Sequence, residues 1–165
     1  MDIRLDDLTH PAVLALLAEH LAGMHAITPI EHAHALDVSG LKAPGISFWT
    51  AWEGEALLGC GALKELSPDH GEIKSMRTPA ALRRRGAGRA LLDHIVAEAR
   101  RRGYTRVSLE TGSHPEFAPA HALYRSAGFV PGGPFAEYHA SPDNVFMTLR
   151  LQPAGSAPPS AGPSR

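Results

Sequence analysis

The chain has 165 residues, which is enough for one domain with one hydrophobic core. Hydrophobic residues make up 44% of it and the formal net charge is −1, so the composition gives no reason to expect binding to nucleic acid or to an anionic membrane. The single cysteine, Cys60, excludes an internal disulfide, and no segment approaches the roughly 18 apolar residues of a membrane span. Charged residues interrupt the N-terminal segment, so we expect a cytoplasmic protein without a secretory signal.

The spacing of apolar residues predicts an α+β fold. Alternation or short apolar runs between turn residues indicate strands, and apolar residues three and four apart indicate helices. In chain order, we expect a strand at 2–5, a helix at 11–24, a short helix at 33–36, strands at 48–52, 56–66 and 71–77, a helix at 89–102, a strand at 106–111, a helix at 119–127 and strands at 129–130 and 145–151. These elements fit one domain at 1–151 with a mixed central sheet flanked by helices. Residues 152–165 are mostly Pro, Ala, Gly and Ser, and we expect a disordered tail there.

A basic, glycine-containing loop joins the strand at 71–77 to the following helix. It reads Leu82-Arg83-Arg84-Arg85-Gly86-Ala87-Gly88-Arg89. A helix start carries unpaired backbone N–H groups and a partial positive charge, glycines admit a bulky anion, and arginines add charged donors. These features predict a pyrophosphate-binding loop, with an ordinary basic helix start as the alternative. The loop lacks the Gly-Lys-Ser/Thr end of a P-loop and the third glycine of the dinucleotide-binding motif.

Two motifs in this order resemble those of the GNAT superfamily of acyl-CoA N-acyltransferases. The first is Arg83-x-x-Gly86-x-Gly88, and the second is Ala120-x-x-Leu123-Tyr124-x-x-x-Gly128-Phe129. The resemblance covers about residues 48–151. Phe117 stands where many members carry Asn. Leu109-Glu110-Thr111-Gly112 and Pro134-Phe135-x-x-Tyr138 are similar to motifs of a bacterial branch whose substrate is unsettled.

The resemblance implies acetyl-CoA as the cofactor. The strands at 71–77 and 106–111 belong to a strand–helix–strand unit, so they should be parallel and adjacent, with a right-handed connection. In the superfamily these strands splay apart, and the pantetheine arm lies in the gap. The cofactor-binding residues implied in this way are Met76, Thr78, Arg83, Arg84, Gly86, Ala87, Gly88, Arg89, Phe117 and Ala120.

Two side chains are expected to be catalytic. The resemblance assigns Tyr124 as the acid that protonates the leaving thiolate, with helix packing as the alternative role. Glu72 is the expected base, and a structural glutamate is the equally weighted alternative; Glu110 and His34 are rival bases. In a regular strand, Glu72 and Met76 point to one face, and the backbone N–H of Met76 would stabilise the oxyanion.

The acceptor pocket is expected to come from residues 27–41, 110–117 and 131–144, because binding specificity usually resides in loops. Its expected substrate-binding residues are His34, Glu110, Thr111 and Tyr138. The leading hypothesis is an acetyl-CoA-dependent N-acetyltransferase of a small amine or amino-acid-like metabolite. The alternatives are a peptide or protein N-acetyltransferase and a non-catalytic acyl-CoA-binding module. The scattered histidines predict no metal site, and the sequence leaves a homodimer open.

Overall fold

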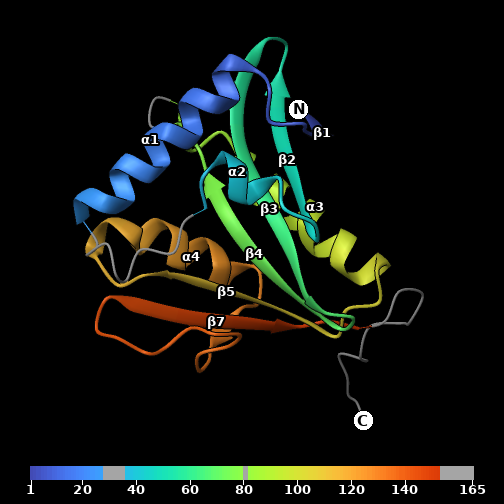
Figure 1. The fold of residues 1–165 in the computed structure, drawn as a ribbon, viewed down its shortest axis with the longest axis vertical. Coiled ribbons are helices and arrows are strands. Elements are labelled where there is room, and N and C mark those ends of the chain that lie inside the picture. The colour runs from blue at the N-terminus through green and yellow to red at the C-terminus, as the bar shows by residue number, and fades with distance from the viewer. Residues whose placement is uncertain (28–35, 80–81, 153–165) are drawn as a thin grey trace.

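The computed structural model describes residues 1–27, 36–79 and 82–152, which contain a seven-stranded mixed sheet with helices on both faces (Figure 1). The strand order is β1-β2-β3-β4-β5-β7-β6. The strands are β1 (Asp2–Leu5), β2 (Ile46–Glu53), β3 (Ala56–Ser67), β4 (His70–Arg77), β5 (Arg106–Gly112), β6 (Val130–Pro131) and β7 (Asn144–Arg150). The helices are α1 (Pro11–Ile27), α2 (Val38–Leu41), α3 (Ala87–Arg101), the 3-10 turn η3 (Pro115–Phe117) and α4 (Ala118–Ser126). The predicted α+β class and mixed sheet are confirmed.

Each predicted strand begins and ends within two residues of an observed one. The structure does not test the short helix predicted at 33–36, apart from Leu36, and the sequence did not predict α2. Residues 33–35 lie outside the described part of the chain, and the described helix α2 begins at Val38. It begins there because the side chain of Asp37 accepts a hydrogen bond from the Gly40 backbone N–H at 2.8 Å, which caps the first turn. The predicted tail likewise falls on residues that are not described, apart from Gln152.

Two apolar cores cover the two faces of the sheet. On one face, Ile73 of β4 packs in a cluster with Leu91, Leu92 and Ile95 of α3 and Tyr124 of α4. On the other face, Cys60 and Ala62 of β3 pack with Val13, Leu16 and Leu17 of α1. Each fully buried aliphatic side chain contributes about 1.5–3 kcal/mol. Burial raises the pKa of Cys60 to about 12, so this thiol is the small packing residue that its apolar neighbours predict.

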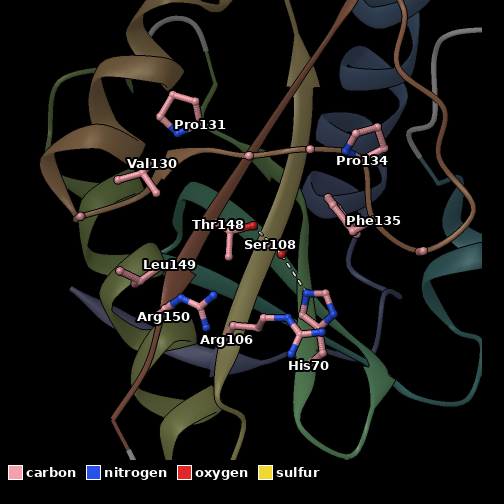
Figure 2. Close-up of a pocket in the computed structure, with 14 residues that line it drawn as sticks. His70, Arg106, Ser108, Val130, Pro131, Pro134, Phe135, Thr148, Leu149 and Arg150 are labelled. Atoms are coloured by element: carbon pink, nitrogen blue, oxygen red, sulfur yellow. Dashed lines mark hydrogen bonds between the residues drawn. The ribbon is translucent and has the colours of Figure 1, made fainter.

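The strands β4 and β5 are parallel, as predicted, but they pair along only part of their length. Register runs from His70 opposite Arg106 to Ile73 opposite Leu109 and stops there. In the paired part, His70 Nε2 and Ser108 Oγ lie 2.8 Å apart, and Ser108 Oγ lies 2.8 Å from Thr148 Oγ1 of β7 (Figure 2). Beyond it the strands separate, which Figure 1 shows clearly. The predicted splay is therefore confirmed.

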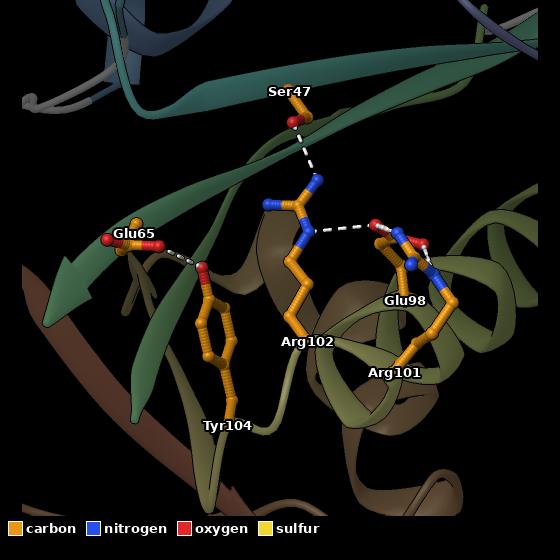
Figure 3. Close-up of polar contacts among 6 residues, drawn as sticks. All are labelled: Ser47, Glu65, Glu98, Arg101, Arg102 and Tyr104. Atoms are coloured by element: carbon orange, nitrogen blue, oxygen red, sulfur yellow. Dashed lines mark hydrogen bonds and ion pairs between the residues drawn. The ribbon is translucent and has the colours of Figure 1, made fainter. Parts of the chain in front are cut away.

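Polar contacts fix the C-terminal end of α3 against the sheet (Figure 3). Arg102 donates to Glu98 at 2.8 Å and to the hydroxyl of Ser47 on β2 at 2.8 Å. Tyr104 donates to Glu65 on β3 at 3.0 Å. These contacts fix the C-terminal end of α3. Because the helix is rigid, they also determine the position of its N-terminal end, which follows the basic loop.

Candidate active site

A cavity of about 90 Å³ lies where β4 and β5 separate. Side chains from four elements and one turn surround it. The lining residues are His20 of α1; Glu72, Ile73, Lys74, Ser75 and Met76 of β4; Glu110 and Thr111 of β5; Phe117 of η3; and Ala120 and Tyr124 of α4. Most of the residues that the sequence predicted for catalysis and for the pantetheine arm therefore meet at one place, although they are far apart in the chain.

Glu72 is held in a buried polar network. Its side chain is 2% exposed, and its Oε2 accepts hydrogen bonds from Tyr138 Oη at 2.5 Å and from Lys74 Nζ at 3.0 Å. Lys74 also donates to Tyr138 Oη at 2.7 Å. Burial and the negative charge of Glu72 raise the pKa of Tyr138 above its ordinary value, so this phenol stays protonated and donates. No described residue donates a hydrogen bond to Glu72 Oε1.

Tyr124 lines the cavity from α4. Its ring packs against Phe129 with 5.9 Å between ring centroids, and its hydroxyl makes no hydrogen bond with any described residue. Burial raises the pKa of Tyr124 to about 12. The hydroxyl therefore carries its proton at neutral pH and has no structural partner that competes for it.

A bulge in β4 contradicts one detail of the predicted site. Ser75 has a left-handed backbone with φ of 56°, and Cys60 and Ala62 of β3 pair with Arg77 and Lys74, so the strand gains an extra residue here. The extra residue turns Met76 to the opposite face from Glu72, where its Sδ packs beside Gly61 and the α3 core. The prediction that Glu72 and Met76 share a face is therefore wrong.

The bulge also affects the backbone of β4. Among the described residues, neither Ser75 nor Met76 has a register partner in β3 or β5. The side-chain hydroxyl of Ser75 is buried without a hydrogen bond, whereas its carbonyl accepts from Cys60 Sγ at 3.3 Å. On the side of β5, the backbone at this point of β4 thus has no strand partner among the described residues, as an extended ligand that pairs with β4 requires.

His20 is a site residue that the sequence reasoning missed. It lines the cavity from α1, and its Nδ1 is buried without a hydrogen bond. Burial, aided by the positive charge of Arg77, lowers the pKa of His20 to about 4, so its ring is neutral at physiological pH. The signal was present in the sequence, because His20 continues the helical stripe of Val13, Leu16 and Leu17 into an otherwise apolar face.

The predicted pyrophosphate loop leads into α3. Arg84 and Gly86 both have left-handed backbones, with φ of 68° and 82°, and the helix begins at Ala87. The first hydrogen bond within the helix is from the Ala90 N–H to the Gly86 carbonyl, so the preceding N–H groups remain for a ligand. A left-handed turn just before a helix start forms an anion-binding concavity.

The arginines of this loop differ in what they contact. Arg83 and Arg84 form no ion pair with any described residue, whereas Arg89 donates to Asp93 at 2.9 Å and to Ser126 at 3.2 Å. The guanidinium charge of Arg89 is therefore already paired within the protein. Arg83 and Arg84 are the better matched to a bound pyrophosphate.

The remaining predicted cofactor residues lie between this loop and the cavity. Thr78 Oγ1 lies 3.9 Å from the position that a Cβ would take at Gly88. Phe117 lies across Gly112 so closely that its ring occupies the space of any Cβ there, which explains the glycine at the end of β5. Ala120 and Phe117 line the cavity, as the resemblance implies for residues that contact the pantetheine arm.

The predicted acceptor residues are brought together in part. Glu110 and Thr111 line the cavity, Tyr138 reaches Glu72, and the Asn144 side-chain amide donates to Glu110. His34 lies outside the described residues. Among the described residues no cluster of His, Cys, Asp and Glu side chains fits a metal ion. No described helix is long and apolar enough to cross a membrane.

Comparison with known proteins identifies the family. YsnE, an uncharacterized N-acetyltransferase of Bacillus subtilis strain 168, is 53% identical over 151 residues, which are 92% of this chain and 100% of that protein. IAA acetyltransferase of Azospirillum brasilense is 36% identical over 141 residues, which are 85% of this chain and 91% of that protein.

Solved structures agree with these relatives. A crystal structure from Klebsiella pneumoniae subsp. pneumoniae, assigned to the acyl-CoA N-acyltransferases, superposes with a TM-score of 0.75 at 26% identity and covers 92% of this chain and 97% of that one. An acetyltransferase of Bacillus subtilis in complex with CoA has the same fold, with a TM-score of 0.63, 20% identity and coverage of 91% and 98%. The model of the acetyltransferase (GNAT) family matches residues 14–129, and the chain belongs to this family of enzymes.

Proposed function

We propose that this acetyltransferase transfers an acetyl group from acetyl-CoA to the amino group of a small molecule. The observation that carries the proposal is that the Tyr124 hydroxyl and the Glu72 carboxylate line the same small cavity at the separation of β4 and β5. A proton donor and a proton acceptor on one cavity are what acyl transfer to an amine needs.

The described residues fit acetyl-CoA in three respects. The left-handed turn at Gly86 and the start of α3 offer N–H groups to a pyrophosphate. Arg83 and Arg84 carry charges that no described carboxylate pairs. The bulge at Ser75 leaves backbone groups of β4 facing the cavity, where an amide-containing arm can pair with them. When bound there, acetyl-CoA supplies the thioester whose acetyl group is transferred.

The chain's own groups supply the proton transfers. Tyr124 donates the proton that the departing sulfur needs, because its hydroxyl stays protonated and lacks a structural partner. Glu72 accepts the amine proton at Oε1, directly or through one water, because Oε2 is engaged by Tyr138 and Lys74. The backbone N–H of Met76 stabilises the developing oxyanion, a contribution of about 2.7–4 kcal/mol in comparable sites. Holding both reactants in the cavity contributes about 7–11 kcal/mol more.

The acceptor is small, because the loop that carries Tyr138 is tied down over the cavity. Tyr138 is anchored to Glu72 and Lys74 on β4, and Phe135 and Phe146 pack on its ring. The cavity has a volume of only about 90 Å³. A relative at 36% identity is named for IAA, not for a protein acceptor, which also favours a small molecule. Glu110 and Thr111 line the side of the cavity at β5 and bind the acceptor.

A thiol-release assay tests the proposal. Purified protein is incubated with acetyl-CoA and a panel of small amines, amino acids and short peptides with free N-termini. Thiol release with small amines or amino acids and not with peptides supports the proposal. Faster release with peptides would make the chain a peptide acetyltransferase. Acetyl-CoA binding without release from any acceptor would make it a binding module.

The Glu72→Gln variant tests the base, because it keeps the shape of the side chain and removes its basicity. Turnover should fall by roughly 10²–10⁴ while acetyl-CoA affinity stays the same. Glu110→Gln is the matched control, since Glu110 is a carboxylate on the neighbouring strand that lines the same cavity. A larger loss in the Glu110 variant than in the Glu72 variant would move the base to Glu110.

A further inference from the structure

A second, larger pocket lies on the same face of the sheet, at the end of β4 and β5 where the strands pair. Its volume is about 840 Å³, and the loop from Val130 to Ala136 forms its outer wall. His70, Arg106 and Arg150 line its end near the start of β5, and Figure 2 shows Arg106 reaching toward His70. The proposed acetyl-transfer chemistry uses none of these side chains.

The two arginines of this pocket lie at neighbouring positions of the sheet. Arg106 of β5 is the register partner of Arg150 of β7, so the two side chains leave the sheet on the same face at neighbouring positions. Like charges directly opposite each other destabilise a sheet. The nearest carboxylate is Asp69, 4.0 Å from Arg106 and largely exposed, and Arg150 pairs with no described carboxylate. An anion bound between the arginines would offset their repulsion.

The rest of the second pocket is polar where the strands line it and apolar where the loop from Val130 to Ala136 lines it. His70, Ser108 and Thr148 form a hydrogen-bonded chain across the three strands. Phe135 lies against His70 with 6.0 Å between ring centroids, and Figure 2 shows its ring at the mouth of the pocket beside Pro134. A cationic end beside an apolar wall is complementary to an organic molecule that carries one anionic group.

Aromatic side chains separate this pocket from the candidate active site. Phe135 contacts Tyr138 and Phe146, with centroid separations of 5.1 and 5.9 Å, and Tyr138 contacts Phe146 at 6.1 Å. Tyr138 faces Glu72 beyond this partition. The two pockets are thus distinct sites, and no lining residue is common to both.

We propose that the second pocket binds a small organic anion, a carboxylate or a phosphate monoester, with its charged group between Arg106 and Arg150 and its apolar part against Phe135. The inference does not depend on the acceptor of the acetyl group, because it rests on residues outside the candidate active site.

The test follows backbone amide signals by NMR in protein saturated with CoA, so that the loop at Gly86 does not compete for anions. Benzoate and phenyl phosphate are titrated separately, and uncharged benzamide is the ligand control. Saturable shifts are expected at His70, Arg106 and Thr148 with the anions and not with benzamide. Whether benzoate or phenyl phosphate binds more tightly identifies the class of anionic group.

The double variant Arg106→Gln/Arg150→Gln should weaken anion binding by about tenfold or more. Arg100→Gln/Arg125→Gln is the matched control, since it removes the same charge from exposed positions on α3 and α4 and should bind the anions normally. The Arg106/Arg150 variant should keep its melting temperature rise with acetyl-CoA. Equal weakening in both double variants, or shifts scattered over surface arginines, would overturn the proposal.

A second measurement uses the unaltered protein. Burial, and then the positive charge of Arg106, hold the pKa of His70 below its ordinary value, while Asp69 and Glu72 oppose this effect. A bound anion adds negative charge beside the ring, so the pKa of His70 should rise on titration with benzoate. An unchanged His70 pKa at saturating benzoate would contradict the placement of the anion.

Discussion

The Tyr124→Phe variant separates catalysis from stability, because no described residue forms a hydrogen bond with the Tyr124 hydroxyl. The change removes one oxygen and keeps the ring that packs on Phe129. No hydrogen bond to a described residue is lost, so the free energy of unfolding should change by no more than about 0.5 kcal/mol. If the hydroxyl is the acid, turnover should instead fall by roughly 10²–10⁴.

The pKa of Tyr124, raised to about 12, sharpens this expectation. A pH of 8 lies about four units below this pKa, so only about one Tyr124 side chain in ten thousand is ionised. The acid is therefore protonated throughout the range in which enzymes are usually assayed. Ionisation of Tyr124 should not limit turnover at moderately alkaline pH.

Thermal melting and the thiol-release assay measure the two effects side by side. Tyr104→Phe is the matched control, since Tyr104 is also a buried tyrosine but donates to Glu65 at 3.0 Å (Figure 3). This control should lose about 1 kcal/mol, which lowers the melting temperature by roughly 2–4 °C, and should keep its turnover. Full turnover in Tyr124→Phe would make Tyr124 a packing residue and refute the assignment.

Two further predictions concern the cofactor loop and pH. Gly86→Asp adds a Cβ and a carboxylate at a residue whose backbone φ is 82°. The rise in melting temperature that acetyl-CoA causes should therefore vanish, and a retained rise would contradict the phosphate-binding role of this loop. Hydrogen bonds from Arg101 and Arg102 lower the pKa of Glu98 from its ordinary 4.5 to about 2. The ion pairs of Glu98 therefore stabilise the folded protein fully above pH 4.5, and this stabilisation is lost as the pH falls through 2. Glu98→Gln should lower the free energy of unfolding by about 1 kcal/mol at pH 7 and leave it unchanged below pH 2. Thermal melts at a series of pH values measure this difference.

The sequence predicted the fold well where the local pattern was regular. Apolar spacing located α1 and α3, and the strand–helix–strand rule predicted that β4 and β5 are parallel. The sequence did not predict α2 at Val38–Leu41, which begins where the Asp37 side chain caps the first turn. Capping depends on one side chain and one backbone N–H, which composition does not reveal.

The candidate site could be predicted only in part, for a related reason. A strict two-residue alternation puts Met76 on the face of Glu72, but the left-handed backbone at Ser75 resets the alternation. Serine carries no sequence signal for such a conformation, which is more typical of glycine and asparagine. The contact of Lys74 with Tyr138 joins residues 64 positions apart, and no local pattern predicts such a pair.

The bulge at Ser75 and the hydrogen bond from Tyr138 to Glu72 lie at the two ends of one short segment of β4. The bulge at Ser75 interrupts the pairing of β4 with β3 at a point where β4 has already parted from β5, which leaves backbone groups for an extended ligand. Three residues earlier, Tyr138 and Lys74 engage one oxygen of Glu72 and leave the other for a proton from the acceptor. Because Tyr138 belongs to the loop over the acceptor side, a shift of that loop must also change the hydrogen bonds of the proposed base. Acceptor binding and the hydrogen bonding of the proposed base are therefore linked through the Tyr138 hydroxyl.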